Sequence, residues 1–182
     1  MIGLKKPDRF TPPLMLAFRA AFRDHDSGKG LDLKDDAGER IIPGRRASPR
    51  NAVSEAALRQ ELSDDLSALL NSVNMAASED ISQFSYVSKS ILNYGLNDLT
   101  AISIDESAVE DIGVELKKIL SAYEPRLVAD SIIVERDQSV DSALLKLRFN
   151  VRAEMYATPV DVPVEFIADF EVGIGKMQIT RL

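Results

Sequence analysis

The chain contains no cysteine and only one histidine, His25, among its 182 residues. Without cysteine it can form no disulfide and no thiolate nucleophile, which fits a reducing compartment. Metal sites of the Cys/His type are excluded for the same reason. A catalytic arrangement that needs histidine would depend on His25, and that residue lies in a low-complexity stretch. The composition therefore favours a protein that uses neither thiol nor imidazole chemistry.

The chain also lacks an excess of basic residues and a long apolar run. Its formal net charge is −7, whereas a domain that binds a nucleic acid duplex is normally basic. No apolar run approaches the roughly 20 residues that a membrane helix needs. The N-terminus carries Pro7, Pro12 and Pro13 near a short apolar patch, which is a poor secretory signal. We expect a soluble cytoplasmic protein without a nucleic acid partner or direct membrane insertion.

Residues 1–50 are predicted to form an N-terminal arm. A short helix after Pro12-Pro13 would place apolar residues, Leu14 and Phe18 among them, on one side. The rest of the arm is rich in Gly, Asp, Lys, Arg and Pro, so we expect a flexible linker. Two interpretations of the short helix remain open. It docks in the groove of a partner, or it folds back on its own domain, because amphipathic periodicity does not distinguish the two.

Residues 51–182 are predicted to form a compact α+β domain, with about three helices on one face of a mainly antiparallel four-stranded sheet. The first helix would follow Ser48-Pro49, an N-cap and first-turn pair. One apolar face of that helix comprises Leu58, Leu62, Leu66, Leu69, Leu70 and Val73.

Two more helices are predicted before the strands. One covers 86–93 and is followed by Gly95, which can take the left-handed closing conformation. The other covers about 104–123 and opens with Ser103 and Glu106, spaced as a capping box.

The apolar period then changes from 3.6 to 2, which predicts two long strands on either side of Ala157-Thr158-Pro159. Shorter outer strands are predicted at 127–135 and 176–181. Thr158-Pro159 is poor chemistry for a tight two-residue turn, so we expect an irregularity there.

Charge predicts how the two long strands pair, because opposite charges across neighbouring strands stabilise a sheet. An antiparallel hairpin would place three cations opposite three carboxylates: Lys146 with Glu171, Arg148 with Asp169, and Arg152 with Glu165.

The segment Tyr123-Glu124-Pro125-Arg126-Leu127 lies where a helical pattern stops and a strand pattern begins. Pro125 cannot continue a helix and makes a rigid corner. Glu124 lies near the negative end of the helix dipole, where a carboxylate is disfavoured. Arg126 has donors that suit bidentate carboxylate contacts. We expect Glu124, Pro125 and Arg126 to contact a partner. The alternative is an intramolecular ion pair that holds the corner.

No motif predicts a catalytic, metal or cofactor site. Gly28-Lys29-Gly30 lacks the spacing of a phosphate loop, and Gly173–Gly175 reads as a turn. With 29 acidic residues, close carboxylate pairs arise by chance, so a glycosidase pair is neither indicated nor excluded.

Three segments together resemble the phage baseplate-wedge family: Ala57–Asn71, Ser90–Leu99 with its Asn-Tyr-Gly-Leu run, and Tyr123–Leu127 with its Glu-Pro-Arg-Leu run. Within that family the match is closest to the TssE subunits of bacterial type VI secretion systems, over roughly residues 54–182. Pro13-Leu14 with Phe18 is a looser match to the family's N-terminal docking motif.

The resemblance implies a non-enzymatic structural subunit, without a cofactor, in the cytoplasmic baseplate of a contractile injection machine at the inner membrane. Its expected partners are the wedge proteins TssF, TssG and TssK and the contractile sheath, with strand exchange as a contact mode. It also implies an interface role for Glu124 and Arg126. Two alternatives remain: a peptidoglycan hydrolase, as the family's lysozyme label says, and a wedge subunit of a phage or phage-tail-like particle.

Overall fold

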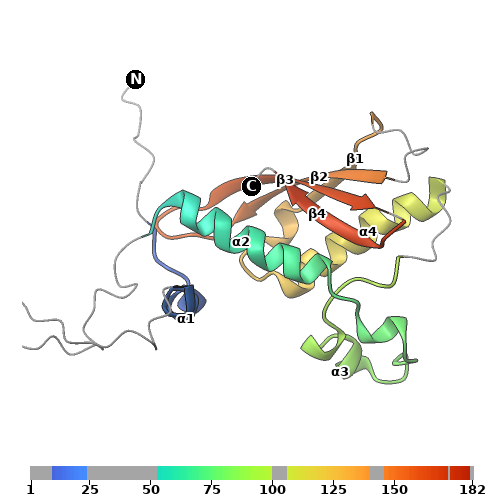
Figure 1. The fold of residues 1–182 in the computed structure, drawn as a ribbon. Helices are drawn as coiled ribbons and strands as arrows, with labels where there is room; N and C mark the ends of the chain where they lie inside the picture. The colour runs from blue at the N-terminus through green and yellow to red at the C-terminus, as the bar shows by residue number, and fades with distance from the viewer. Residues whose placement is uncertain (1–9, 24–52, 100–105, 140–145, 172, 181–182) are drawn as a thin grey trace, which may run out of the picture. The chain divides into compact units, whose positions relative to one another are not determined.

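The computed structural model describes residues 10–23, 53–99, 106–139, 146–171 and 173–180 (Figure 1). The chain divides into two compact units, one of residues 1–58 with 158–160 and one of residues 59–157 with 161–182. The second unit contains the sheet and most of the buried apolar side chains.

The sheet of the second unit has four antiparallel strands in the order β1-β2-β3-β4 (Figure 1). They are β1 (Ile133–Arg136), β2 (Lys146–Met155), β3 (Val162–Glu171) and β4 (Lys176–Thr180). Alternate residues of β2 and β3 are buried, because successive side chains of a strand point to opposite faces. The predicted α+β class with a four-stranded antiparallel sheet is therefore confirmed.

The β2–β3 register is the one that the charges predict. Lys146 lies 2.8 Å from Glu171, and Arg148 binds both oxygens of Asp169 at 2.6 and 2.8 Å. The third predicted facing pair, Arg152 with Glu165, is confirmed by the register, but it does not form the ion pair of the ladder.

Arg152 does face Glu165 in the β2–β3 register, but its guanidinium pairs with Glu135 of β1. Because β2 lies between β1 and β3, the exposed Arg152 has possible partners on both neighbouring strands, and it pairs diagonally with the one on β1.

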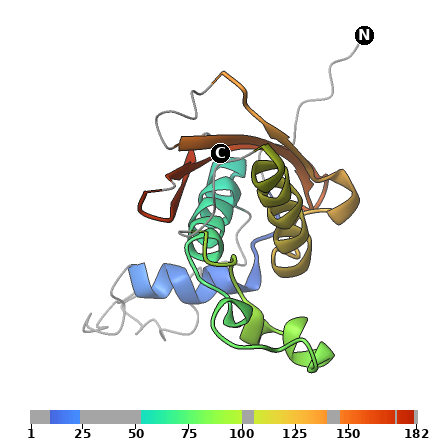
Figure 2. The same ribbon diagram turned by 90° about the vertical axis from the view of Figure 1, so that its right-hand side faces the viewer.

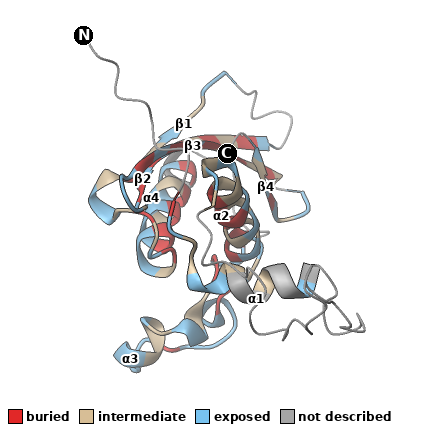
Figure 3. Ribbon diagram, turned by 90° about the vertical axis from the view of Figure 1, so that its left-hand side faces the viewer, coloured by how far each residue is buried: buried red, intermediate tan, exposed pale blue. Residues whose placement is uncertain are grey.

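Two long helices, α2 (Glu55–Leu70) and α4 (Glu106–Tyr123), run along one face of the sheet (Figure 2). Their apolar stripes are buried beneath it, as the red segments of Figure 3 show. The side chains concerned are Leu62, Leu66, Leu69 and Leu70 of α2 and Val109, Ile112, Leu116, Ile119 and Leu120 of α4. Three phenylalanines, Phe149, Phe166 and Phe170, fill the sheet side of this core.

The start of α2 differs from the prediction. The helix begins at Glu55, and the Ser54 hydroxyl oxygen accepts a hydrogen bond from the Ala57 N–H at 3.2 Å, which is the geometry of an N-cap. Ser48-Pro49 and Ser103 lie outside the described residues. Val73 does not belong to the apolar face of α2, because the helix ends at Leu70 and Val73 is 64% exposed.

The predicted middle helix over 86–93 is wrong as a continuous element. The structure has a single helical turn, α3 (Ser85–Ser88), and a 3-10 turn, η4 (Ile91–Asn93). The Ser90 side chain accepts a hydrogen bond from the Leu92 N–H and so starts η4 afresh, since serine competes with helical hydrogen bonding.

The predicted outer strand over 127–135 is shorter than expected. Residues Ala129–Ser131 form the 3-10 turn η5, and the strand begins only at Ile133. Leu127 makes an isolated antiparallel bridge to Met155 instead. The outer strand predicted over 176–181 is confirmed as β4, whose described residues are Lys176–Thr180.

Residues 72–97, which we call the α3 lobe, project away from the sheet (Figures 1 and 3). Two hydrogen bonds close its neck: Leu96 N–H to Ser72 O and Asn74 N–H to Leu96 O, both 2.8 Å. Gly95 in this neck has φ of +117°, and a Cβ there would lie 2.2 Å from the Ser72 carbonyl oxygen. Only glycine fits such a close backbone approach.

The first unit contains the predicted short helix, α1 (Leu14–Arg23), after Pro12-Pro13. Phe10 pairs with Val53 through two backbone hydrogen bonds of 2.8 and 2.9 Å. The expected irregularity at Thr158-Pro159 is confirmed as a cis peptide bond. None of the helices in the described ranges is long and apolar enough to cross a membrane.

Candidate functional site

The helix–strand corner that the sequence singled out is a hydrogen-bonded turn. Helix α4 ends at Tyr123, and the Glu124 N–H still donates to the Leu120 carbonyl at 3.0 Å. The Leu127 N–H then donates to the Glu124 carbonyl at 3.0 Å, which closes the turn around Pro125. Proline suits the second position of such a turn because its φ is preset.

The end of β2 holds this turn from the other side. The Tyr156 N–H donates to the Arg126 carbonyl at 2.7 Å, and the Val128 N–H donates to the Glu154 carbonyl at 2.8 Å. Arg126 therefore projects from a backbone that is fixed by both α4 and the sheet.

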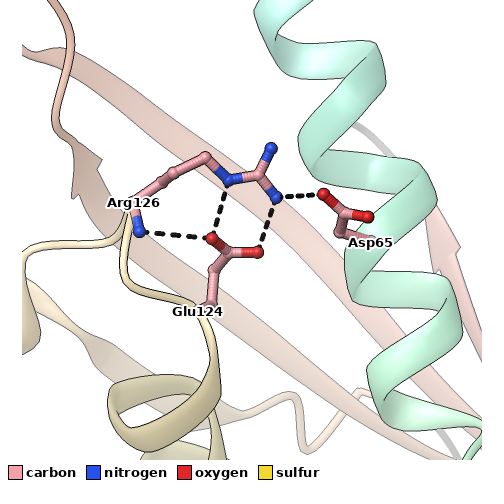
Figure 4. A network of polar contacts seen from close by, with 3 residues as sticks. All are labelled: Asp65, Glu124 and Arg126. Atoms are coloured by element: carbon pink, nitrogen blue, oxygen red, sulfur yellow. Dashed lines mark hydrogen bonds and ion pairs between the residues drawn. The ribbon is translucent and has the colours of Figure 1, made fainter. Parts of the chain in front are cut away.

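Glu124 and Arg126 form an ion pair with each other and with Asp65 of α2 (Figure 4). The Arg126 Nε lies 2.7 Å from Glu124 Oε1, and Arg126 Nη2 lies 2.6 Å from Glu124 Oε2. The same Nη2 lies 2.6 Å from Asp65 Oδ2. The backbone N–H of Arg126 also donates to Glu124 Oε1, at 3.2 Å. We call these three residues the corner triad.

The triad is largely withdrawn from solvent. The Glu124 side chain is 5% exposed, and those of Arg126 and Asp65 are 23% and 27% exposed. Burial alone lowers the pKa of the Arg126 guanidinium, but the hydrogen bonds and charges of Glu124 and Asp65 outweigh it and raise that pKa. Arg126 therefore stays charged, and the Glu124 carboxylate keeps a bidentate partner.

The corner triad acts as a tie between three elements. Asp65 comes from α2, Glu124 from the end of α4, and Arg126 from the segment that leads to the sheet. The structure thus places Glu124 and Arg126 in the intramolecular ion pair that was the alternative interpretation. Pro125 between them is exposed, the Arg126 side chain is 23% exposed, and in Figure 4 no dashed line joins its second terminal nitrogen to Glu124 or Asp65. These are the parts of the corner open to a partner.

Tyr123, one residue before the triad, holds the α3 lobe. Its hydroxyl donates to the Ser90 and Asn93 carbonyl oxygens, at 3.1 and 2.8 Å. Its ring packs edge-on against Tyr94, with centroids 5.6 Å apart. Burial raises the pKa of the Tyr123 hydroxyl above its ordinary value, so it remains a donor at neutral pH. Adjacent residues thus fasten two different parts of the fold.

A groove of about 510 Å³ runs between the last turns of α4 and the α3 lobe. Carboxylates of Glu79, Asp80 and Glu115 and the amines of Lys89 and Lys118 line it. Burial raises the pKa of Glu115, although the Asn97 N–H and the charge of Lys118 act in the opposite direction. No group of three or more His, Cys, Asp or Glu residues able to hold a metal ion occurs in the described ranges.

The other predicted interface residues, Leu14 and Phe18, lie on α1. Leu14 is 79% exposed, and Phe22 near the end of the same helix is 80% exposed. The side chain of Phe18 lies outside the described part of the structure. His25 and the linker that follows it lie outside the described residues as well.

Two residues that sequence reasoning missed are Asp65 and Asn71. Asp65 was one of many acidic residues on a helix, and nothing local connects it with Arg126. Asn71 follows α2, and its side-chain amide binds both backbone groups of Met177 in β4, at 2.8 and 3.1 Å. An asparagine just after a helix was the available signal, but it normally predicts a helix cap.

Fold and site together define an α+β protein in which the ion pairs of the corner triad connect the two long helices to the segment that leads into the sheet. The profile of the family described as Baseplate wedge protein gp25 matches residues 56–160, which is more than half of the chain. The chain therefore belongs to the baseplate wedge protein gp25 family, as the resemblance predicted. Family membership makes it a structural, baseplate-type subunit that associates with other baseplate proteins. Searches of curated proteins and of solved structures found no match.

Proposed function

We propose that this chain is the TssE-type wedge subunit of a type VI secretion system, located in the cytoplasmic baseplate at the inner membrane. In this role it joins wedge proteins of the TssF, TssG and TssK kinds to the contractile sheath. The observation that carries the proposal is the family match over residues 56–160, which includes the corner triad residues Asp65, Glu124 and Arg126. The Asn-Tyr-Gly-Leu and Glu-Pro-Arg-Leu segments support the type VI assignment.

The corner supports a role in contacts between subunits. The triad makes its backbone rigid, and a rigid site loses little entropy when a partner binds. Exposed Pro125 and the exposed part of the Arg126 side chain would form the contact surface, with Glu124 holding the guanidinium in place. On α1, Leu14 and Phe18 would dock in the groove of a wedge partner. The division into an arm of residues 1–50 and a wedge domain of residues 51–182 belongs to the same proposal.

The sheet edges bear on the proposed contact with the sheath. An edge strand presents unpaired backbone groups to which another chain can add a strand. On β4, the backbone groups of Met177 are already bound by Asn71. Next to β1, the Asp137 N–H donates to the Arg148 carbonyl of β2 at 2.8 Å, so by alternation the backbone groups of Arg136 and Val134 point away from β2. Edge β1 is therefore the better acceptor of an added strand.

Co-purification tests the proposal. The tagged chain is expressed with the wedge and sheath genes that neighbour its own. We expect TssF- and TssG-like proteins to purify with it, and sheath subunits to join when the complex polymerises. Recovery of phage tail proteins only would assign the chain to a phage or phage-tail-like particle. Recovery of the chain alone would contradict both assignments.

The corner's role is tested with Arg126→Ala in the same co-expression. If the variant is brought back to wild-type stability by added stabilising substitutions and still assembles fully, the corner is structural and makes no partner contact. We expect assembly to fail even in the stabilised background.

The groove provides a test of the hydrolase alternative. A glycosidase acid needs a raised pKa and a second carboxylate nearby, and Glu115 meets the first condition. We expect purified protein to leave the turbidity of a cell-wall suspension unchanged. Clearing by the wild type that Glu115→Gln abolishes would establish a lytic enzyme.

A further inference from the structure

Strand β1, at one edge of the sheet (Figure 1), presents a short row of unbound backbone groups. By the alternation of the β1–β2 ladder, the N–H and C=O groups of Val134 and Arg136 point away from β2. No hydrogen bond to these groups occurs in the described part of the chain. Groups spaced in this way fit the backbone of another extended segment, whereas a helix has already used its own backbone donors and acceptors. The edge itself therefore specifies an added strand.

Arg136 lies on the side of β1 that the helices cover. It stands directly opposite Phe149 of β2, and opposed residues of an antiparallel pair project from the same face. Phe149 is 1% exposed and belongs to the core. Arg136 is partly buried, and its side chain has no ion pair or hydrogen bond within the described ranges. The core side of this edge thus ends in a cation without a carboxylate.

Helix α4 continues this surface beside the edge. A Cβ on Gly113 would lie 4.0 Å from the Val134 side chain, so this side of α4 faces β1. At about 100° per residue, the positions that follow Gly113 round the helix and away from the core include Lys117, Glu110 and Val114. Lys117 and Glu110 are exposed, and Val114 is 70% exposed. A strand added to β1 would cover apolar surface of α4 as well as the free backbone groups.

A strand added here must supply a carboxylate. It would cover Arg136 from the open side of the edge, and an unpaired charge that is withdrawn from water is strongly unfavourable. An Asp or Glu at the facing position offsets this cost, because its carboxylate can form a bidentate pair with the guanidinium. Inward-pointing charges on edge strands otherwise prevent pairing with other chains. Arg136 therefore rejects most strands and admits one of matching charge.

We infer that Arg136 selects the strand that adds to edge β1, an extended segment of a neighbouring subunit with Asp or Glu at the position facing Arg136. This inference rests on the proposed function, in which that edge receives a strand, and it names the chemistry of the strand. A second copy of this chain does not fit. In an antiparallel pair of β1 strands only Val134 and Arg136 lie on the helix-covered side, so no carboxylate would face either guanidinium. Glu135 pairs with Arg152 on the opposite face.

Hydrogen exchange tests strand addition in the full-length chain, measured alone and after co-purification with the neighbouring wedge and sheath proteins. We expect the Val134 and Arg136 amides to exchange about tenfold more slowly in the complex. The Met177 amide, which Asn71 already binds in the free chain, should change little. Equal exchange of Val134 and Arg136 with and without bound partners would overturn the inference and leave the proposed function intact. If no neighbouring protein co-purifies, the proposed function fails and the inference fails with it.

The choice of strand is tested by exchanging charges. A benzophenone amino acid at Ile133, which is 50% exposed, captures the added segment for identification by mass spectrometry. We expect Arg136→Glu to weaken binding of the captured partner by about tenfold or more, and Arg136→Lys to weaken it less, since lysine keeps the charge. Exchange of the partner's facing Asp or Glu for Arg should restore binding to Arg136→Glu. Lys176→Glu on the other edge strand, β4, is the matched control and should bind as wild type.

Three results would overturn the role of Arg136. The first is equal affinity of Arg136→Glu and wild type at unchanged Tm. If Arg136→Glu lowers the Tm, Arg136→Gln takes its place, and equal affinity of that variant has the same consequence. The second is a captured segment with no Asp or Glu facing Arg136. The third is self-association of the wild type that slows exchange at Val134 and Arg136, because it would assign the edge to a second copy of this chain.

Discussion

Arg126 is the side chain that contacts both carboxylates of the corner, and it neutralises the one that the fold has buried. Its guanidinium binds Glu124 through two nitrogens and reaches Asp65 from one of them. Without Arg126, Glu124 would be left charged in an environment where it is 5% exposed. The stability of the corner therefore depends on the pair and not on either residue alone.

We expect Arg126→Ala to lower the free energy of unfolding by about 3 kcal/mol, since removal of one partner leaves a buried charge unpaired. Adding Glu124→Gln should recover part of that loss. Urea denaturation of wild type, single and double variants measures the coupling. A loss below about 0.5 kcal/mol, typical of a surface pair, would show that the triad does not hold the corner.

Gly95 permits the close backbone approach that closes the α3 lobe. We expect Gly95→Ala to lower the Tm sharply or to prevent folding, because its Cβ would lie 2.2 Å from the Ser72 carbonyl at a positive φ. Gly173→Ala is the matched control, since a Cβ there meets no atom within 4 Å. Thermal unfolding of the two variants should separate them clearly, and equal Tm values would contradict the neck geometry.

Glu115 should make the stability of the folded protein depend on pH. Its pKa in the folded protein is raised, first by burial, so the native state holds this proton to a higher pH than the unfolded state does. Stability is therefore lost as the pH rises from the ordinary pKa through the raised one. We expect Glu115→Gln to be more stable than wild type near neutral pH, with the difference shrinking toward about pH 4. A difference that stays constant with pH would refute this assignment.

At the scale of elements, the edges of the sheet differ in a way that matters for assembly. Met177 lies opposite Phe170 at a position of the β3–β4 pair where both backbone groups face outward. Asn71 occupies those groups with its side-chain amide. The helix end thus blocks one edge against unwanted pairing, which is a common protection of edge strands.

We expect Asn71→Ala to cost about 1–2 kcal/mol, because two backbone groups lose their partners. Amide exchange at Met177 should accelerate, and the variant should self-associate more than wild type. Asn71→Asp keeps the acceptor for the Met177 N–H but loses the donor, so it should show an intermediate effect. Unchanged exchange at Met177 in Asn71→Ala would show that the edge is protected by something else.

At the scale of the whole molecule, the wedge domain should fold without the arm, because the sheet and both long helices lie at and after residue 55. Deletion of residues 1–50 should still lower the Tm, since it removes Phe10, which is 1% exposed and paired with Val53. Phe10→Ala in the full chain is expected to reproduce most of that loss. Calorimetry of both should show one cooperative transition, and a broad, non-cooperative one would contradict the domain division.

How far the sequence predicted this molecule depended on the range of each interaction. The paired strands β2 and β3 were predicted residue by residue, since alternation and charge act between near neighbours of one hairpin. The α4 stripe was predicted as well, because a helix period is local. The break between α3 and η4 was missed, since side-chain capping by Ser90 overrides an apolar pattern that is only a few residues long.

The sequence by itself determined the α+β class, the strand register and the rigid corner at Pro125, because periodicity, cross-strand charge and proline geometry act over a few residues. Only the tertiary structure decided what Glu124 and Arg126 do with their charges, since Asp65 lies about sixty positions earlier in the chain. It also decided which sheet edge is blocked and that the α3 lobe leaves Tyr86 and Leu92 uncovered. Burial is set by what packs against a side chain, and no local pattern encodes that.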